Sequence, residues 1–517
     1  MEVISSIEMK IVDTNARALG ISELQLMESA GKAVAEAVIN KLGNIRGKEV
    51  TVFAGSGGNA GDGFVVARYL ACKGATVNIY LLSKPEELRS EAAKIEYSAL
   101  KYLRLSIKEI KYVRDSSDLP TSVDSDVIID ALLGIGVKGK VREPYLTAIY
   151  TINNSAGFKV AIDIPSGLHP DTGEVLGAAV HASLTVTFHK AKPGLLKRPD
   201  IVGELVVADI GIPPEAELFA GPGDVIYKYP RRHPYVHKGE AGSVLVVGGS
   251  ETYTGAPALA AQAVLRSGSD LVFIAAPERA ADIIASYSPN LITIKLSGSD
   301  HLIPEHIKSL ENILKKVDTV LVGPGLGLSS DTTEAVTELI TKSCDLGKYV
   351  VIDADGLKHV ARNLSLVKEF SKYLVLTPHA GEFKILFNTN VPPPNDLLGR
   401  GEVVSKVSKD YGGVTILLKG PIDVISNGYR TKYNATGVPS MSVGGTGDVL
   451  SGIVASLLSK KVLSPFEAAY IAAYINGLAG ALAHEELGEG MTASDLLRYI
   501  PKVIKDPFEV HSRIYLR

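Results

Sequence analysis

The sequence predicts an α/β protein of two domains, each built on a largely parallel sheet with helices on both faces. Short apolar, β-branched runs alternate with helical segments along most of the 517 residues. The runs are apolar at successive positions, as in strands that are buried on both faces. A charged, proline-rich segment at 213–242 interrupts this alternation. We therefore expect one domain over residues 1–222 and a second over 223–517.

The first series opens with helical periodicity over residues 10–40. A glycine-rich loop at 57–63 is expected to lead into a helix at 64–74, which ends at Gly74. The expected strands are short and apolar: 49–55, 76–82, 126–133, 159–165, 184–189 and 204–210.

The second series repeats the pattern after residue 242, with expected strands at 243–249, 271–277, 319–325, 349–355, 373–378 and 414–420. Residues 421–434 carry an Asn-Gly pair between alternating flanks, which predicts a β-hairpin. The apolar run at 468–483 contains Asn476 and is short for a membrane span, so it predicts a buried core helix.

Composition narrows the class of partner and the compartment. A net charge of −3 favours neither a nucleic acid nor an anionic membrane as partner. The two cysteines, Cys72 and Cys344, fit a reducing cytoplasm and provide neither a disulfide framework nor a cysteine-rich zinc site. The N-terminus lacks the basic head and apolar core of a secretory signal. We expect a cytoplasmic protein.

The glycine-rich segment "AGSGGNAGDG" (54–63) follows a predicted strand and precedes a predicted helix. In an α/β sheet this is where phosphate-bearing ligands bind. The spacing matches neither the dinucleotide fingerprint nor the Walker loop. The segment therefore indicates a ligand loop of unassigned specificity, and a tight turn without a ligand is the alternative.

Oxygen-bearing side chains gather at the ends of the predicted strands in the first half. Asp130 and Asp163 end two apolar runs, and Asn59 and Ser166 lie in the adjoining loops. A set without sulfur or imidazole suits a hard cation rather than zinc. Alternatively, each of these residues caps a helix or closes a turn, as Asp, Asn and Ser often do.

The strongest single motif is "SVGGTGDVLSG" (442–452), which opens an apolar helical segment. Backbone N–H groups at such a helix start can hold a transferring phosphoryl group. Asp448 can accept the proton of an attacking hydroxyl. The motif indicates phosphoryl transfer from a nucleotide to a small alcohol. His379 and Lys419 follow other predicted strands. Taken alone, a histidine there is more often a structural hydrogen-bonding residue than a catalyst, and a lysine there is more often a solvated charge.

The motifs taken together resemble a known family. The second half contains "YTGAPALAAQAVLRSG", "GPGLG", "VIDADGL", "LTPHAGEF", "LLKG" and "GGTGDVLSG", and is similar to nucleotide-dependent NAD(P)H-hydrate dehydratases of the ribokinase-like fold. The first half contains "MKIVDTNARALGISELQLMESAG", "AGSGGNAGDG", "DALLGIGVKG" and "DIPSGL", and is similar to NAD(P)H-hydrate epimerases. The whole chain resembles bifunctional NAD(P)H-hydrate repair enzymes. This resemblance implies a Rossmann-like three-layer α/β/α domain followed by a ribokinase-like α/β domain.

For the epimerase half, the resemblance implies that Asp163 is an acid–base group that contacts the substrate. It implies K+ ligation by Asn59, Asp130 and Ser166. The usual family pattern Asn-Asn-Gly-Gly-Asp-Gly is replaced here by Gly58-Asn59-Ala60-Gly61-Asp62-Gly63, and we expect the methyl group of Ala60 to narrow the approach of the ligand. The further implied substrate contacts are Gly58, Asn59, Ala60, Gly61, Asp62, Gly134, Ile135, Gly136, Val137, Lys138, Gly139 and Lys140.

For the dehydratase half, the resemblance implies Asp448 as the catalytic base and Mg2+ with the nucleotide. The implied hydrate contacts are Ala256, Gly325, His379 and Asp448, and the implied nucleotide contacts are Lys419, Gly420, Pro421, Ile422, Asp423, Gly445, Thr446 and Gly447. The implied substrates are hydrated NADH and NADPH with ADP, and ATP is the alternative phosphoryl donor. We also expect a homo-oligomer.

Three other functions fit parts of the sequence. The first is a vitamin-type small-molecule kinase with a fused nucleotide-binding domain, which would release a stable phosphorylated product. The second is an N-terminal half that only binds a nucleotide. The third is an NAD-dependent dehydrogenase, which the two glycine-rich loops disfavour because both lack the dinucleotide fingerprint.

Overall fold

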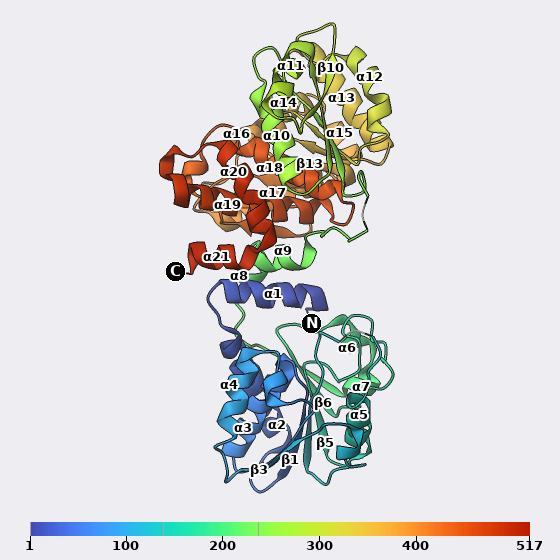
Figure 1. Ribbon diagram of the computed structural model, residues 1–517, viewed down its shortest axis with the longest axis vertical. Coiled ribbons are helices and arrows are strands. Elements are labelled where there is room, and N and C mark those ends of the chain that lie inside the picture. The colour runs from blue at the N-terminus through green and yellow to red at the C-terminus, as the bar shows by residue number, and fades with distance from the viewer. Residues whose placement is uncertain (1, 138, 236, 517) are drawn as a thin grey trace. The chain divides into compact units, whose positions relative to one another are not determined.

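A computed structural model describes residues 2–137, 139–235 and 237–516 (Figure 1). The chain forms two compact units, Met1–Pro213 and Pro214–Arg517. Each unit is described separately below.

The second unit begins at Pro214, eight residues before the boundary at residue 222 that the sequence predicts. The segment after Pro214 is held to the second unit by contacts of its own. The Ala220 amide donates to the Tyr433 carbonyl at 2.8 Å. The buried Asp224 accepts from Lys432 Nζ at 2.7 Å. Because these partners lie about 200 residues further along the chain, the local sequence does not reveal them.

Unit 1 contains one seven-stranded sheet in the order β3-β2-β1-β4-β5-β6-β7, with every neighbouring pair parallel. Its strands are β1 (Glu49–Ala54), β2 (Thr76–Leu81), β3 (Ile107–Tyr112), β4 (Val127–Ala131), β5 (Phe158–Ile162), β6 (Leu184–Phe188) and β7 (Glu204–Ala208). The chain runs outward from β1 through β2 to β3, then returns to β4 on the other side of β1. The β1/β4 boundary is therefore the switch point of the sheet, where ligands of such folds bind.

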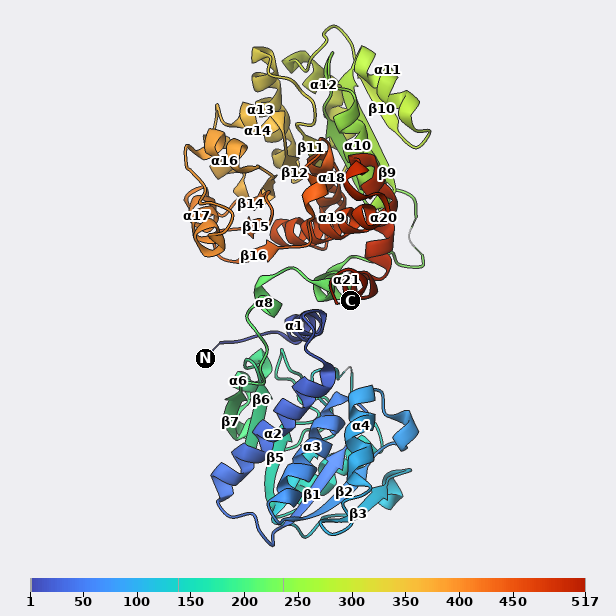
Figure 2. The ribbon, with the colours of Figure 1, turned by 90° about the vertical axis from the view of Figure 1, so that its left-hand side faces the viewer.

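Helices cover both faces of this sheet (Figures 1 and 2). On one face lie α2 (Glu23–Leu42), α3 (Gly58–Cys72) and α4 (Glu91–Leu100), and on the other lies α5 (Tyr145–Asn154). The short helices α6 (Pro193–Lys197) and α7 (Pro199–Val202) follow β6, and α1 (Ser6–Ala18) lies beyond the end of the sheet. The periodicity at 10–40 belongs to two helices rather than one, because Gly20 has φ of 92° and Ser22 caps α2 in a capping box with Gln25. The predicted three-layer α/β arrangement is confirmed for this unit.

Helix α3 begins at Gly58, so the predicted loop at 57–63 is wrong for most of its length. Its glycines serve close packing. A Cβ atom on Gly61 would lie 2.4 Å from Met27 Sδ, and one on Gly63 would lie 2.5 Å from Ala131 Cβ. The helix therefore approaches α2 and β4 at distances that a side chain would prevent.

Unit 2 contains a nine-stranded sheet in the order β10-β9-β8-β11-β12-β13-β14-β15-β16. The strands are β8 (Ser243–Val247), β9 (Leu271–Pro277), β10 (Ile292–Leu296), β11 (Thr319–Val322), β12 (Tyr349–Ile352), β13 (Leu374–Leu376), β14 (Thr415–Leu418), β15 (Asp423–Ser426) and β16 (Thr431–Asn434). Pairs as far as β14 are parallel, and β14, β15 and β16 pair antiparallel. The predicted hairpin is confirmed, and the switch point lies between β8 and β11.

Two apolar cores flank this sheet. Along β8, Val244 and Val246 face the core formed with α10, α18, α19 and α20, whereas Leu245 and Val247 face the opposite core. The longer helices of unit 2 are α9 (Pro222–Lys228), α10 (Gly255–Arg266), α11 (Glu278–Tyr287), α12 (Pro304–Leu314), α13 (Ser330–Asp345), α14 (Asp355–Val360), α16 (Ala380–Phe387), α17 (Leu397–Asp410), α18 (Thr446–Ser459), α19 (Pro465–Leu487), α20 (Ala493–Lys505) and α21 (Pro507–Tyr515). The shorter helices are α8 (Glu215–Leu218), α15 (Ser365–Glu369), η3 (Ser371–Tyr373), η4 (Pro439–Met441) and η5 (Gly488–Gly490).

Helix α19 is longer than the apolar run at 468–483. In the part of the chain that the structure describes, it is the one helix long and apolar enough to cross a bilayer by length and composition. However, 94% of its most apolar window is buried inside the structure. The prediction of a buried core helix is confirmed, and its expected shortness was wrong.

Candidate active sites

The loops after β1 and β4 meet at the switch point of unit 1. Asn59, in the first turn of α3, donates from Nδ2 to the Leu133 carbonyl at 3.1 Å. A Cβ atom on Gly134 would lie 3.6 Å from Asn59 Cβ. The structure thus brings the two predicted ligand segments, 58–62 and 134–140, together at this point. Ala60 is fully buried, so its methyl group lines no exposed surface. Lys138 lies outside the described residues.

Asp130 and Ser166 form a buried polar pair beside Asn59. The Asp130 carboxylate accepts from the Ser166 amide at 2.7 Å and from Ser166 Oγ at 2.5 Å. Burial raises the pKa of Asp130 to about 6, although the Ser166 hydrogen bonds lower it. No positively charged side chain pairs with Asp130 among the described residues. A buried carboxylate without a cation, next to amide and hydroxyl oxygens, fits a hard monovalent or divalent ion.

Asp163 follows β5 with a φ of 63°, a left-handed conformation that is uncommon for a residue with a side chain. Its Oδ1 accepts from Lys192 Nζ at 2.6 Å and from Thr187 Oγ1 at 2.9 Å. Lys192 is fully buried and also donates to the Phe188 carbonyl at 3.1 Å. The sequence analysis missed Lys192, which lies 29 residues after Asp163 in a segment without a recognisable motif.

Two further carboxyl groups interact electrostatically with this ion pair. Burial raises the pKa of Asp13 to about 7, with Asp163 adding to the rise and Lys192 opposing it. Burial, followed by the charges of Asp163 and Asp13, holds the pKa of Asp62 well above its ordinary value. The unit 1 site therefore combines the Asp163–Lys192 ion pair with two buried carboxyl groups whose pKa values are raised above the ordinary range.

In unit 2 the glycine-rich motif forms the N-terminus of α18. Gly445 is the N-cap residue with a φ of 98°, which favours glycine, and Asp448 lies in the first helical turn. Burial raises the pKa of Asp448 to about 7, and the negative charge of Asp353 adds to the rise while Lys419 opposes it. Its carboxylate has no hydrogen-bond partner among the described residues. The backbone N–H groups of Gly445, Thr446 and Gly447 belong to the unpaired donors of the helix start.

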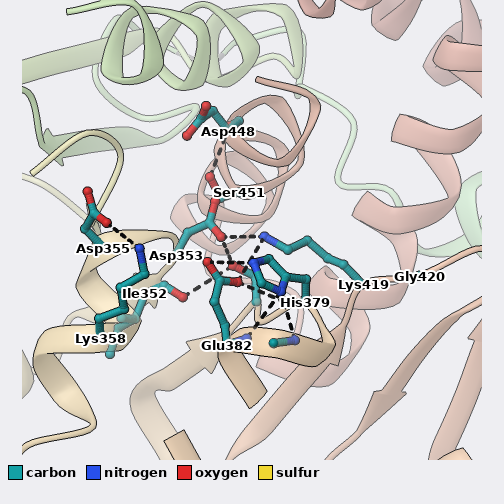
Figure 3. A network of polar contacts seen from close by, with 12 residues as sticks. Ile352, Asp353, Asp355, Lys358, His379, Glu382, Lys419, Gly420, Asp448 and Ser451 are labelled. Carbon is teal, nitrogen blue, oxygen red and sulfur yellow. Dashed lines mark hydrogen bonds and ion pairs between the residues drawn. The ribbon is translucent and has the colours of Figure 1, made fainter. Parts of the chain in front are cut away.

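Lys419 connects this helix start to the sheet (Figure 3). Its Nζ donates to Asp353 Oδ1 at 2.8 Å and lies 3.9 Å from Glu382 Oε2. A Cβ atom on Gly447 would lie 3.3 Å from the same Nζ. Although burial lowers the pKa of Lys419, the charges of Asp353 and Glu382 outweigh it and raise the pKa above its ordinary value. Lys419 is therefore a fixed positive charge beside the glycines of α18.

His379 is the N-cap residue of α16. Its Nδ1 accepts from the amides of Gly381 at 3.0 Å and Glu382 at 3.2 Å. Because Nδ1 is an acceptor in this geometry, the neutral ring carries its proton on Nε2. Nε2 lies 3.5 Å from Glu382 Oε1, and 60% of the His379 side chain is exposed. His379 thus caps α16 through Nδ1, and this hydrogen bonding fixes the direction of its Nε2–H group.

The switch point of unit 2 brings Ala256 and Gly325 together. A Cβ atom on Gly325, where φ is 67°, would lie 3.7 Å from Ala256 Cβ and 2.8 Å from Tyr253 Cβ. Beside them, Asp355 accepts from the Gly327 amide at 3.1 Å. These residues extend the site from the start of α18 across the carboxyl ends of β8, β11 and β12.

The segment 419–423, here called the nucleotide segment, connects β14 to β15. Asp423 accepts from the Gly420 amide at 3.0 Å and from Asn434 Nδ2 at 3.0 Å. Burial raises the pKa of Asp423 to about 6, and these hydrogen bonds lower it. The segment thus has a fixed shape of its own, and it starts at Lys419.

Comparison with known proteins finds one family model within each unit. A family model described as NAD(P)H-hydrate dehydratase matches residues 244–502, and one described as YjeF-related protein N-terminus matches residues 23–194. Bifunctional NAD(P)H-hydrate repair enzymes from Hyperthermus butylicus and Pyrobaculum aerophilum are each 48% identical to this chain. The alignments cover 99% of this chain and 94% of the first relative, and 98% of this chain and 98% of the second.

The chain belongs to the family of bifunctional NAD(P)H-hydrate repair enzymes. A solved ribokinase-like superfamily protein from Enterococcus faecalis is 23% identical, with a TM-score of 0.48 over 56% of this chain and 95% of that chain. The resemblance found in the sequence motifs and the two-domain fold class are confirmed.

Within this NAD(P)H-hydrate repair family member, the structure adds residues that the sequence analysis did not assign. Asp353 and Glu382 lie within the quoted motifs "VIDADGL" and "LTPHAGEF", so their motifs had signalled them without giving a role. Both hold Lys419 in place. Lys192 had no such signal. The partner of a buried charge is set by the packing of strands, which single-sequence motifs do not encode.

Proposed function

We propose that the C-terminal unit converts hydrated NADH or NADPH back to NADH or NADPH. It would phosphorylate the ring hydroxyl with ADP and then eliminate the phosphate. We propose that the N-terminal unit interconverts the R and S hydrates. One observation carries the first part: Asp448, an unpaired carboxylate with a pKa of about 7, lies in the first turn of α18. It combines a base poised near neutrality with donors for a phosphoryl group.

In the first step, Asp448 takes the proton of the hydroxyl at carbon 6 of the hydrated nicotinamide ring. That oxygen forms a bond to the terminal phosphorus of ADP, the bridging P–O bond breaks, and AMP leaves. We propose that the N–H groups of Gly445 to Gly447 hold the negative charge on the transferring group, together with the Lys419 ammonium beside Gly447.

In the second step, the C–O bond to the phosphate breaks with the help of the ring nitrogen's electron pair. Inorganic phosphate leaves, a proton is lost from carbon 5, and the dihydronicotinamide ring is restored. Phosphorylation is needed because phosphate is a far better leaving group than hydroxide. Ala256, Gly325 and His379 are proposed to bind the hydrate across the switch point.

Mg2+ fits this site as a companion of the nucleotide. The described residues contain no group of three or more His, Cys, Asp or Glu side chains arranged to hold a metal ion. Mg2+ commonly binds through substrate phosphates and one or two carboxylates. When bound, it would neutralise phosphate charge, with Asp355, whose charge acts on Asp448, as the candidate protein ligand.

In the N-terminal unit, we propose that Asp163 moves the proton during epimerisation and that Lys192 fixes its position and charge. Asn59, Asp130 and Ser166 are proposed as ligands of K+, and segments 58–62 and 134–140 as substrate contacts. The buried, unpaired charge of Asp130 supports the cation, which would hold the loops after β1 and β4 in place.

The test adds the full chain and ADP to purified hydrated NADH and follows the recovery of reduced-nicotinamide absorbance. We expect complete recovery, with release of inorganic phosphate. Recovery limited to the share of one hydrate would refute the epimerase. No recovery with either ADP or ATP would refute the whole proposal. Three expectations stay predictions: ADP is the preferred phosphoryl donor, the protein lies in the cytoplasm, and it forms a homo-oligomer.

Two variants separate this proposal from its rivals. Asp448→Asn keeps the size of the side chain but cannot accept the proton, so recovery should stop while nucleotide binding persists. Asp163→Ala should leave only uncatalysed interconversion of the hydrates. A vitamin-type kinase would instead accumulate a phosphorylated product. Normal turnover by Asp448→Asn would exclude Asp448 as the catalytic base.

A further inference from the structure

Arg400 is a buried cation that none of the motifs singled out. It lies in α17 with 3% of its surface exposed. Its Nη1 donates to the Pro392 carbonyl at 3.0 Å, which fixes the direction of the side chain from one side. Among the described residues, Nη2 has no hydrogen-bond partner. Nη2 is not one of the fully buried polar atoms that lack a partner, so this donor still reaches solvent and is open to a ligand.

The Nη2 atom points at the nucleotide segment. A Cβ atom on Gly420 would lie 2.9 Å from it, so Gly420 is the residue that leaves room for the guanidinium. Gly420 directly follows Lys419, whose Nζ lies beside Gly447. Arg400 therefore contacts the residue that directly follows Lys419, a proposed phosphate contact.

Asp423 attracts Arg400 without pairing with it. The charge of Asp423 raises the pKa of Arg400, against the larger lowering by burial. Yet no ion pair joins these two side chains among the described residues, and the Asp423 oxygens accept from Gly420 and Asn434. The guanidinium thus keeps an unused donor on the inner side of the nucleotide segment.

We propose that Arg400 is a nucleotide-binding residue of the dehydratase site, with Nη2 donating to a phosphate or ribose oxygen of the nucleoside diphosphate held along residues 419–423. The inference rests on the proposed function, which puts a nucleotide at this segment. A guanidinium suits phosphate and sugar oxygens because its planar donors have a fixed direction.

The experiment measures binding of ADP to the full chain by titration calorimetry. Arg400→Met removes every donor at similar length, and we expect the Kd for ADP to rise about tenfold to a hundredfold, as for a lost charge-assisted hydrogen bond. Arg400→Lys should lose part of this affinity, because it keeps the charge but not the planar fork. Arg498→Met, at an exposed arginine paired with Glu486, is the matched control and should bind ADP like the wild type.

A second variant covers the case in which Arg400→Met does not fold. Gly420→Ala places a methyl group 2.9 Å from Nη2 and should displace the guanidinium. This variant should therefore also bind ADP more weakly than the wild type. Titrations with AMP and adenosine identify the acceptor. A loss shared by ADP and AMP assigns a phosphate oxygen, and a loss that extends to adenosine assigns the ribose.

The outcomes separate the two proposals. If the wild type binds no ADP or ATP, the proposed function fails and Arg400 has no nucleotide to contact. If the wild type binds ADP and the folded Arg400→Met, Arg400→Lys and Gly420→Ala variants bind it within about twofold of the wild type, the Arg400 proposal alone is overturned. A role confined to holding α17 would lower the melting temperature of Arg400→Met and leave its ADP affinity unchanged.

Discussion

The pH dependence of dehydration tests the role of Asp448 most directly. With a pKa of about 7, the carboxyl group carries a proton in acid and accepts one from the substrate only above neutrality. The ionised fraction is about one tenth at pH 6 and about nine tenths at pH 8. We therefore expect the rate of phosphoryl transfer to rise nearly tenfold over this range, with its midpoint near pH 7.

The structure also predicts how this midpoint moves. After burial, the charge of Asp353 is the largest influence that raises the pKa of Asp448, and Lys419 opposes it. Asp353→Asn removes the raising charge and leaves Glu382 as the one carboxylate beside Lys419 apart from Asp448, and both changes favour ionised Asp448. The midpoint should fall by about one pH unit, even though the displaced Lys419 also slows the reaction.

The assay is single-turnover recovery of reduced-nicotinamide absorbance at saturating ADP and constant ionic strength. Asp318→Asn, a carboxylate near Lys461 at the opposite end of the strands, is a control whose midpoint should match the wild type. A flat profile between about pH 6 and pH 8 would refute Asp448 as the base. An unchanged midpoint in Asp353→Asn would refute the electrostatic account.

Three further predictions concern the rest of the chain. Lys192→Met leaves Asp163 buried without its cation and should destabilise unit 1 by about 3–5 kcal/mol, whereas adding Asp163→Asn should restore much of this in calorimetry. Replacing K+ by a large organic cation should slow epimerisation and lower the melting temperature of unit 1, and K+ should bind more weakly below about pH 6, where Asp130 is protonated; equal rates in both salts would contradict the cation site. Gly323→Ala, at φ of 131° with its methyl 1.8 Å from a carbonyl oxygen after β12, should cost about 3 kcal/mol or more in urea unfolding. Gly347→Ala, at φ of 71° in open space, should cost only about 1 kcal/mol, and equal costs would show that the close contact is relieved.

The strands that the sequence analysis missed share one property. β3 (Ile107–Tyr112) and β10 (Ile292–Leu296) are the first strands in the order of their sheets, and each has exposed positions. These two edge strands are half solvated, and their sequences lack the continuous apolar run by which other strands were recognised. The edge strand β7 keeps such a run, at residues 205–207, and was predicted. The central strands are buried on both faces, and their composition alone predicted them.

The candidate sites divide in a similar way. Local sequence determined Asp448 and the glycines of α18, because a helix start that holds phosphate needs those residues at that spacing. It also determined which residues end strands, and hence which edge of each sheet carries the chemistry. These features depend on neighbours within a few residues, so a short sequence motif is enough to predict them.

Only the tertiary structure decided which charges meet. Lys419 pairs with Asp353 across 66 residues, and Lys192 with Asp163 across 29. Arg400 reaches Gly420 because α17 packs beneath the nucleotide segment. Such contacts depend on strand order and helix packing, which bring together distant residues whose own surroundings in the sequence are unremarkable. The sequence thus determined the kind of chemistry, and the fold determined the protonation and placement of the groups that perform it.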